Sequence, residues 1–386
     1  ISLGLVGSEM CIRDRIYTDP AALPRDTYVQ VDLAALASNM DAIRAMVGPE
    51  VAVMPVIKAN GYGLGAVGIA PTLLAHGACC LAVATLTEAL ELREAYPDAP
   101  LFILGHTPDR LLPVVVRECI TQTIFTAAQG KLLSEAASCL GTRAKVHLKV
   151  DSGFHRLGTE NVEELFSICR EPNLEIEGIF SHLALAGEEE DARQYARFMA
   201  VVEALEARGV SFRYKHLADS IAAVDYPEYR MNMIRPGALV YGLRGFHKGY
   251  VEVKQAVSFI TRISQLHRIK KGEGVGYDYL WRAPEDTLVG TVPFGYADGY
   301  PRNMRGKGYV TIHGVKCPLI GVLCMDQCMV DLTAVPDARE GDLAVIYGDG
   351  TNNTMSIQEA SELAGTNKNE IVARLLPRPP RVYING

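Results

Sequence analysis

One lysine follows an apolar run in the segment MPVIKANGYGLGA, residues 54–66. β-Branched residues before Lys58 predict a buried strand, and a loop containing Gly61, Gly63 and Gly65 comes after it. Lysine forms Schiff bases with carbonyl cofactors, and the glycines would leave room for a bulky group at its amine. A surface lysine in a loop is the alternative that this stretch leaves open.

Polar and ionisable residues follow four other predicted strands. They are Lys149 with Arg156, His182, His216 with Ser220, and Arg235. The carboxyl ends of the strands of a parallel barrel meet at one face, where active sites form. Such residues at five strand ends are more typical of an active site at one face of the barrel than of isolated buried polar groups.

The residues after the last strand also suit a phosphate group. Barrel enzymes often bind phosphate near strands seven and eight, through backbone N–H groups of small residues. Gly237 and Ala238 are small residues at this point, and the Ser220 hydroxyl would lie beside them. A lysine for an imine, with a phosphate site opposite it, predicts pyridoxal 5'-phosphate as the cofactor.

The elements that must position these residues alternate between two patterns. Short apolar runs are separated by segments of helical spacing, and the runs cover residues 51–58, 80–85, 101–105, 121–125, 145–150, 174–181, 212–217 and 231–234. Strand–helix alternation predicts a parallel sheet, and eight runs are the number that a (β/α)8 TIM barrel needs. After about residue 253, alternating glycine and β-branched residues predict antiparallel strands, with one late helix in SIQEASELAG.

We therefore expect an α/β protein with a barrel that binds pyridoxal phosphate over residues 28–250. A mainly β domain would follow over residues 251–386, with residues 16–27 joining the two. The first fifteen residues, ISLGLVGSEMCIRDR, fit poorly with the rest of the chain, and their apolar part is short and has no basic lead. We interpret them as a non-native or disordered remnant and not as a secretory signal.

The composition excludes several classes of protein. The chain has 386 residues, of which 48% are hydrophobic and 22% charged, as in an ordinary soluble protein. A net charge of −7 argues against a nucleic-acid partner, and no apolar run approaches the roughly 20 residues that span a membrane. The nine cysteines are scattered and form no zinc pattern. We expect reduced thiols, no metal and a cytoplasmic location.

Seven motifs resemble those of the alanine racemase family, the fold type III pyridoxal phosphate enzymes. They run from about Tyr28 to Tyr383 in the family's order: VIKANGYG, KVDSGFHRLG, SHLA, MIRPGALVYG, VGYDYLW, VPFGYADGYPR and CMDQCMVDL. The resemblance implies a barrel with a C-terminal β domain. It also implies an enzyme that interconverts L- and D-alanine and supplies D-alanine for bacterial cell-wall peptidoglycan.

The resemblance further implies two catalytic bases on opposite faces of the substrate α-carbon. Lys58 would hold the cofactor and act as one base, and Tyr277 would act as the other from the partner subunit of a homodimer. A single base would tend to restore the starting enantiomer. Arg235 would face the pyridine nitrogen, and because a guanidinium stays protonated, this nitrogen would remain unprotonated and the cofactor would be a weaker electron sink.

The other motif positions imply supporting roles. Contacts to the cofactor phosphate are matched by Tyr62, Ser220, Gly237, Ala238 and Tyr296. The substrate side is matched by Arg156, which steers the carboxylate and the tyrosine base, and by the partner-supplied Met325 and Asp326. Neighbouring side chains are oriented by His182, His216 and Lys149, the last of which is often carbamylated in this family.

Two departures from the family pattern bear on the substrate. Asp219 stands where the family usually has asparagine, and Pro377 where it usually has a tyrosine near the substrate. Loss of this large aromatic ring could enlarge the pocket, so a serine or broad-specificity racemase is the alternative to an alanine racemase. A decarboxylase of the same fold is disfavoured by Arg235, because those enzymes keep an acidic residue at the pyridine nitrogen. A non-catalytic carrier of pyridoxal phosphate is disfavoured by the second domain, which such carriers lack.

Overall fold

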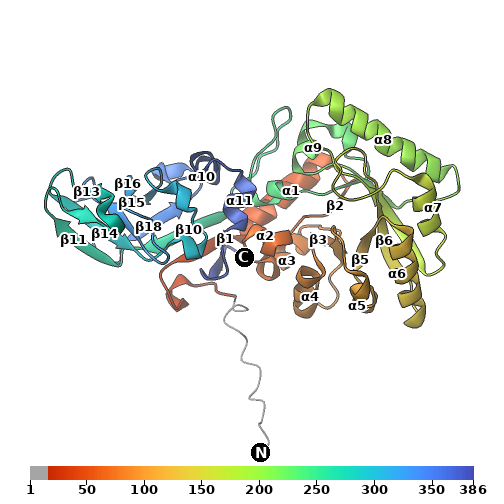
Figure 1. Ribbon diagram of the computed structural model, residues 1–386, viewed down its shortest axis with the longest axis horizontal. Coiled ribbons are helices and arrows are strands. Elements are labelled where there is room, and N and C mark those ends of the chain that lie inside the picture. The colour runs from red at the N-terminus through yellow and green to blue at the C-terminus, as the bar shows by residue number, and fades with distance from the viewer. Residues whose placement is uncertain (1–15) are drawn as a thin grey trace, which may run out of the picture. The chain divides into compact units, whose positions relative to one another are not determined.

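The computed structural model describes residues 16–386 and shows two compact units (Figure 1). The first, here called the barrel unit, comprises Ala35–Gly61 and Ile69–Lys254. The second, the β unit, comprises the described residues up to Ala34, together with Tyr62–Gly68 and Gln255–Gly386. The prediction for residues 1–15 lies outside the described residues.

The barrel unit contains a sheet of eight parallel strands in the spatial order β2-β9-β8-β7-β6-β5-β4-β3. These strands are β2 (Ala52–Val53), β3 (Leu81–Val83), β4 (Leu101–Ile103), β5 (Thr121–Ile124), β6 (Ala144–Lys149), β7 (Leu174–Phe180), β8 (Tyr214–His216) and β9 (Met233–Ile234). The backbone of Ala82 bonds to Pro55 at 3.0 Å and to Ile57 at 2.8 Å, which joins β3 to the chain after β2. The predicted (β/α)8 barrel is therefore confirmed, and each strand lies within or within one residue of its predicted run.

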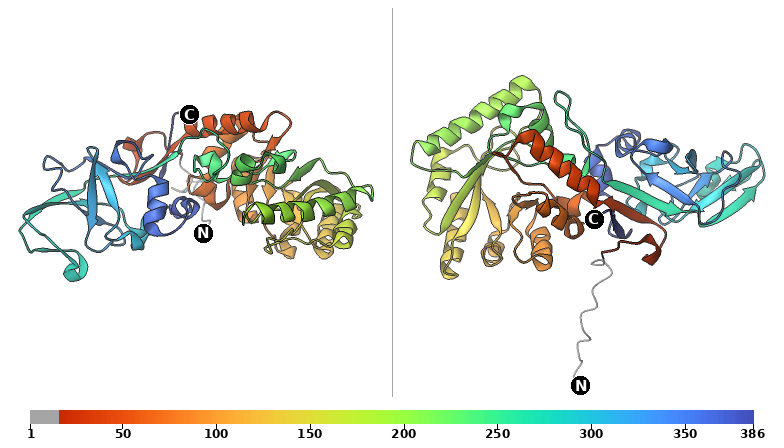
Figure 2. Two further views of the ribbon diagram at one scale, coloured as in Figure 1. Left: turned by 90° about the horizontal axis from the view of Figure 1, so that it is seen from above. Right: turned by 180° about the vertical axis from the view of Figure 1, so that it is seen from behind.

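Helices follow most of the barrel strands, and Figures 1 and 2 show α4 to α8 on the outside of the strands. The helices of this part of the chain are α1 (Leu33–Val47), α2 (Lys58–Tyr62), α3 (Ala66–Ala75), α4 (Leu86–Ala95), α5 (Leu112–Arg117), α6 (Ala127–Cys139), α7 (Val162–Cys169), α8 (Glu188–Glu206) and α9 (Ser220–Asp225), with the short turns η3 (Asp109–Leu111), η4 (Pro227–Tyr229) and η5 (Ala238–Tyr241). Side-chain N-caps at Thr85, Thr126 and Asn161 begin α4, α6 and α7. These caps satisfy N–H groups that would otherwise lack acceptors.

The β unit is built on a nine-stranded sheet in the order β11-β14-β17-β16-β15-β18-β10-β1-β19. Its strands are β1 (Tyr28–Asp32), β10 (Val257–Arg262), β11 (Gln265–Ile269), β14 (Thr287–Val292), β15 (Tyr309–Ile312), β16 (Val315–Ile320), β17 (Cys328–Asp331), β18 (Leu343–Tyr347) and β19 (Arg381–Ile384), and β12 (Gly274–Val275) pairs separately with β13 (Trp281–Arg282). Helices α10 (Ile357–Ala364) and α11 (Lys368–Ala373) precede β19. The predicted mainly β region with a late helix at SIQEASELAG is confirmed, and α11 is a second helix that the sequence analysis did not predict.

The first strand differs from the prediction. Tyr28–Asp32 pairs antiparallel with β10 and parallel with β19, so it belongs to the sheet of the β unit. The sequence analysis grouped it with the barrel. Val29 and Val31 are fully buried, and their alternation predicts a strand without specifying the sheet that it joins.

The glycine-rich loop packs closely against the C-terminal segment of the β unit. A Cβ at Gly63 would lie 2.1 Å from the Val372 carbonyl oxygen, and one at Gly68 would lie 2.0 Å from the Tyr383 ring. The Arg381 guanidinium donates to the Gly63 carbonyl at 2.7 and 2.9 Å. Glycines at these positions therefore allow the C-terminal segment to approach the loop closely.

Candidate active site

Lys58 follows the first barrel strand and begins a left-handed turn. Ala59, Asn60 and Gly61 have φ of 53°, 53° and 62°, and Tyr62 has φ of 53°. Left-handed geometry costs roughly 1–2 kcal/mol for each residue that carries a Cβ. Because three of these four residues carry one, contacts elsewhere must offset the strain.

Glu88 provides one of these contacts. One carboxylate oxygen accepts from the Ala59 N–H at 2.7 Å, and the other accepts from the N–H groups of Ala84 and Thr85 at 2.7 and 3.2 Å. The second oxygen completes the capping box that begins α4. The sequence analysis missed Glu88, although Thr85-Leu86-Thr87-Glu88 fits the S/T-x-x-E pattern of such a box.

The Lys58 amine is partly buried, and its pKa lies below the usual value for lysine. Burial is the main cause and the positive charge of Arg156 adds to it, whereas the Glu88 carboxylate opposes them. Both lowering effects favour the neutral amine. Only the neutral amine can attack a carbonyl group or accept a proton, so this environment suits both tasks.

Basic side chains from several strand ends gather around His182. The pKa of His182 is lowered to about 2, mainly by burial and further by the charges of Arg235, Lys149, Arg156 and Lys58, in that order of effect. His182 is therefore neutral at physiological pH. The structure brings these residues together as the sequence predicted, and their positive charge suits an anionic ligand.

The Phe180 ring lies close to two of these basic side chains. The Lys149 Nζ lies 4.6 Å from the centre of the Phe180 ring, and the Arg235 guanidinium lies 5.1 Å from it. Burial lowers the pKa of Lys149 well below its usual value, and the charges of Arg235 and Arg156 add to this effect. These effects favour the neutral form of the buried Lys149 amine.

Two of the predicted phosphate contacts, Ser220 and Gly237, are hydrogen-bonded to each other. The Ser220 hydroxyl oxygen accepts from the backbone N–H groups of Gly237 at 2.9 Å and Leu239 at 3.2 Å. The hydroxyl hydrogen is then available for another acceptor. Ala238 is the first residue of η5, and the N–H of a first helical residue has no acceptor within its own helix. Ser220 and Ala238 therefore offer donors that fit a phosphate group, whereas the Gly237 N–H points to Ser220.

Asp219 caps the neighbouring helix. Its carboxylate accepts from the N–H groups of Ile221 and Ala222, both at 3.0 Å, at the start of α9. Burial raises the pKa of Asp219, and these two bonds and the charge of Arg235 act in the opposite direction. The departure from asparagine thus retains a capping oxygen and places a half-buried carboxyl group near Arg235.

Asp219→Asn is expected to change the free energy of unfolding by less than about 1 kcal/mol at pH 7, since the two residues cap helices about equally well. Asp219→Ala removes the acceptor and is expected to cost about 0.5–2 kcal/mol. Denaturant titration measures both changes. Equal losses in the two variants would contradict the capping role.

The raised pKa of Asp219 makes the free energy of unfolding depend on pH. The folded protein holds the Asp219 proton more tightly than the unfolded chain, so the stabilising contribution is complete below the unfolded pKa of about 3.9. It is lost as the pH rises through the higher folded pKa. Wild-type protein should therefore lose stability relative to Asp219→Asn as the pH rises across this window. The opposite trend in the same titrations would contradict burial of the carboxylate.

The other predicted site residues belong to the β unit. Tyr277 begins η6 (Tyr277–Tyr279) and has 67% of its surface exposed, and Met325 has 52% exposed. Tyr277 also lines a surface pocket of about 410 Å³ with Cys324 and Met329. Tyr62 is buried, and Tyr296 is half-buried with the Arg302 guanidinium 5.4 Å from its ring centre.

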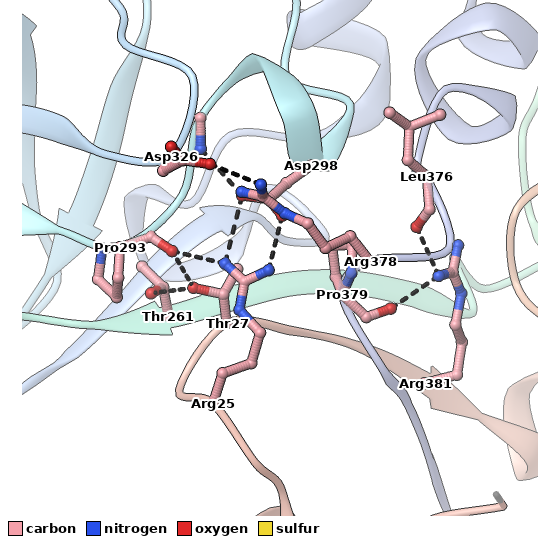
Figure 3. Close-up of polar contacts among 11 residues, drawn as sticks. Arg25, Thr27, Thr261, Pro293, Asp298, Asp326, Leu376, Arg378, Pro379 and Arg381 are labelled. Atoms are coloured by element: carbon pink, nitrogen blue, oxygen red, sulfur yellow. Dashed lines mark hydrogen bonds and ion pairs between the residues drawn. The ribbon is translucent and has the colours of Figure 1, made fainter. Parts of the chain in front are cut away.

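Asp326 is held by a network of arginines (Figure 3). Arg378 donates to the Asp326 carboxylate at 2.6 Å and to both oxygens of buried Asp298 at 2.7 and 3.0 Å. Arg25 donates to the same Asp298 carboxylate at 2.7 Å. Asp298 thus anchors Arg378, which in turn fixes the loop that carries Met325 and Asp326.

Two protein-family models together match nearly the whole chain. "Alanine racemase, N-terminal domain" matches residues 31–245, and "Alanine racemase, C-terminal domain" matches residues 256–383. The chain belongs to the alanine racemase family. None of the helices within residues 16–386 combines the length and the apolar character needed to cross a membrane.

Individual members of the family are similar over almost their full length. The alanine racemase of Clostridium tetani is 36% identical over 372 residues, which cover 93% of this chain and 96% of the relative. That of Desulfovibrio desulfuricans is 37% identical over 369 residues, with 93% and 98% covered. The solved alanine racemase of Bacillus anthracis with bound L-Ala-P has a TM-score of 0.88 and 30% identity, covering 94% of this chain and 96% of its own. That of Streptomyces coelicolor has a TM-score of 0.89 and 31% identity, with 95% and 100% covered.

Proposed function

We propose that this protein is a pyridoxal 5'-phosphate-dependent alanine racemase that uses Lys58 and Tyr277 as its two bases. The observation that carries the proposal is the gathering of Lys58, Arg156 and Arg235 around His182 at the carboxyl ends of the barrel strands. Membership of the family supports it. In a bacterial cell this activity would supply D-alanine for peptidoglycan.

The residues of the barrel unit fit the cofactor. Lys58 offers its carbonyl group an amine whose lowered pKa favours the neutral form, and the Ser220 hydroxyl and Ala238 N–H offer donors for its phosphate. When bound, pyridoxal 5'-phosphate withdraws electrons from the α-carbon of an amino acid and makes the proton there removable. Arg235 would face the ring nitrogen, and its pKa of about 10 keeps the guanidinium charged at neutral pH. A charged guanidinium can only donate, so it leaves that nitrogen without a proton.

Each of the two bases transfers a proton at one face of the substrate α-carbon. The Lys58 Nζ would remove the α-proton from one face of the substrate, and the Tyr277 Oη would donate a proton to the other face. The roles exchange in the reverse direction. Arg156 would hold the substrate carboxylate, and the neutral amine of Lys149 is the form that carbamylation requires. The carbamate would add a negative charge beside Arg156 and so hold it in place.

The exposure of the second base supports a shared site in a homodimer. Tyr277, Tyr279, Leu280 and Met325 are all more than half exposed. Apolar side chains that are exposed together commonly mark a protein–protein interface. We propose that the partner subunit covers this surface and that Tyr277 and Met325 complete the partner's site.

Mixing inactive Lys58→Ala and Tyr277→Phe proteins is expected to restore activity. If each site takes Lys58 from one chain and Tyr277 from the other, a mixed dimer contains one intact site. Each parent dimer contains only damaged sites. Differently tagged chains establish that subunits exchange, and exchange without recovered activity would show that both residues come from one chain.

The experiment that tests the proposed function is a racemisation assay on the loaded protein. Purified protein with pyridoxal 5'-phosphate is incubated with each enantiomer of alanine, serine, lysine and glutamate, and the opposite enantiomer is measured by chiral chromatography. Alanine should be racemised in both directions. Protein that binds the cofactor and racemises none of these amino acids would favour a carrier, and fast racemisation of serine would favour the broader enzyme.

Pro377 bears on the choice between alanine and serine. It is exposed in the loop whose carbonyl groups at Leu375, Leu376 and Pro379 accept from Arg381, and Figure 3 shows the last two of these bonds. The Arg381 bonds fix the backbone on both sides of Pro377. We propose that the small ring leaves space beside the substrate side chain.

Pro377→Tyr is expected to lower kcat/KM for serine more than for alanine, because a larger ring would collide with the longer substrate. Wild-type protein should racemise serine within about tenfold of alanine, a difference of roughly 1.4 kcal/mol. Pro377→Ala is the control, since it frees the backbone torsion that proline restricts without adding bulk. Equal changes of the serine-to-alanine ratio in both variants would refute the steric explanation.

A further inference from the structure

A chain of buried side chains connects Arg235 to the far side of the barrel strands. The Arg235 Nη1 lies 2.7 Å from the His216 Nδ1, and the His216 Nε2 lies 2.7 Å from the His147 Nδ1. The His147 Nε2 in turn lies 3.6 Å from the Glu177 carboxylate. His147 is on β6 and Glu177 on β7, and neither residue was singled out by the sequence analysis.

The Arg235 guanidinium fixes which nitrogen of each histidine carries the proton. A guanidinium can only donate, so the His216 Nδ1 must accept and cannot carry a proton. Burial lowers the pKa of both His216 and His147, so each ring is neutral and carries a single N–H. The His216 proton is then on Nε2 and is donated to the His147 Nδ1. The His147 proton is likewise on Nε2 and points to the Glu177 carboxylate.

The packing holds both rings in these positions. The His216 ring is stacked on Phe180 with 4.8 Å between centres and 2° between planes, and the His147 ring lies 4.7 Å from Phe102. A Cβ at Gly178 would lie 2.7 Å from the His147 Nδ1, so a side chain there would displace the His147 ring. The space for this chain of bonds is thus built into β7.

The Glu177 carboxylate suits a His147 ring that has its proton on Nε2. The Glu177 side chain is only 12% exposed, and it also faces Lys145 at 3.7 Å and Arg213 at 3.5 Å. The contact with His147 is the main cause that lowers the pKa of Glu177, so the carboxylate is ionised and can only accept. An acceptor at this end favours the His147 tautomer that has its proton on Nε2.

We propose that Glu177 and His147 are positioning residues that act on Arg235 through the tautomer of His216. If His147 carried its proton on Nδ1, this proton would face the His216 Nε2–H or force the His216 proton onto Nδ1. The His216 Nδ1–H would then oppose the Arg235 N–H and displace the guanidinium. The tautomer assignment depends only on the contacts among these four side chains, and its consequence for the cofactor rests on the proposed function.

The test is a two-bond ¹H–¹⁵N spectrum of the full-length protein labelled on histidine, with pyridoxal 5'-phosphate added. His147 and His216 should both appear as neutral Nε2–H tautomers that do not titrate between about pH 6 and 8, and the signal of His182, which is also neutral in this range, is identified separately with a His182→Asn variant. His147→Asn assigns one of the two signals. A charged His216, or one with its proton on Nδ1, overturns the inference even if every variant fails to fold.

Glu177→Gln tests the carboxylate itself. The variant should show a mixture of His147 tautomers, because the amide can donate as well as accept, and kcat/KM should fall about tenfold, near the lower end of what outer partners of functional histidines contribute. Glu175→Gln makes the same change on the same strand and should alter neither readout. A single unchanged tautomer in Glu177→Gln overturns the positioning role. Failure to bind pyridoxal phosphate with the tautomers as assigned would instead count against the proposed function.

Discussion

Lys58→Ala is expected to lower kcat for alanine racemisation by about 10⁴-fold or more, at or beyond the upper end of the contribution of a general base. The variant loses a base and also the amine that would hold the cofactor. Because Lys58 is partly buried and has a lowered pKa, its removal takes away no strongly stabilising charge. The protein should therefore still fold.

The control is Lys131→Ala, which removes a lysine that is 68% exposed on the surface. Its activity should equal that of wild-type protein. Added methylamine should restore part of the activity of Lys58→Ala by replacing the missing amine, and it should have no effect on the control. A folded Lys58→Ala protein that retains more than about a tenth of the activity would remove Lys58 from the chemistry.

Tyr277→Phe is expected to slow proton exchange from one enantiomer of alanine by about 10²–10⁴-fold, the usual contribution of a general acid or base. Exchange from the other enantiomer should change far less, because Lys58 still serves its face. Entry of solvent deuterium into each enantiomer, measured before racemisation is complete, separates the two faces. Equal losses at both faces would contradict the assignment of two bases.

Tyr279→Phe is the matched control for this variant. Tyr279 lies two residues away in the same η6 turn and is 59% exposed. The substitution removes the same hydroxyl group from a neighbouring tyrosine. Exchange at both faces should be unchanged, and an asymmetric loss in Tyr279→Phe as large as that in Tyr277→Phe would attribute the effect to the η6 turn and not to the Tyr277 hydroxyl.

The sequence predicted those parts of the molecule that depend on local pattern. The eight barrel strands were recognisable because apolar, β-branched runs alternate with helical segments, and the ends of the strands identified Lys58, Arg156 and Arg235. The strand Tyr28–Asp32 was assigned to the wrong unit because alternation predicts a strand and not its neighbours. Its partners β10 and β19 lie more than two hundred residues away in the chain.

The parts that the sequence did not predict depend on tertiary contacts. Gly63 makes space for the backbone of Val372, which is about three hundred residues distant in the chain. Glu88 was visible as half of a capping box, but its bond to Ala59 required the folded chain. His147 and Glu177 lie inside ordinary strands, and only the distances across the barrel join them to Arg235.

The measurement that tests the central claim most directly is reduction of the purified protein with borohydride, followed by peptide mapping. Borohydride fixes a carbonyl cofactor to the lysine that holds it. We predict that the pyridoxyl label is recovered on the peptide that contains Lys58 and that Lys58→Ala protein takes up no label. Recovery of the label on any other lysine of the wild-type protein would contradict the assignment of Lys58 as the residue that holds the cofactor.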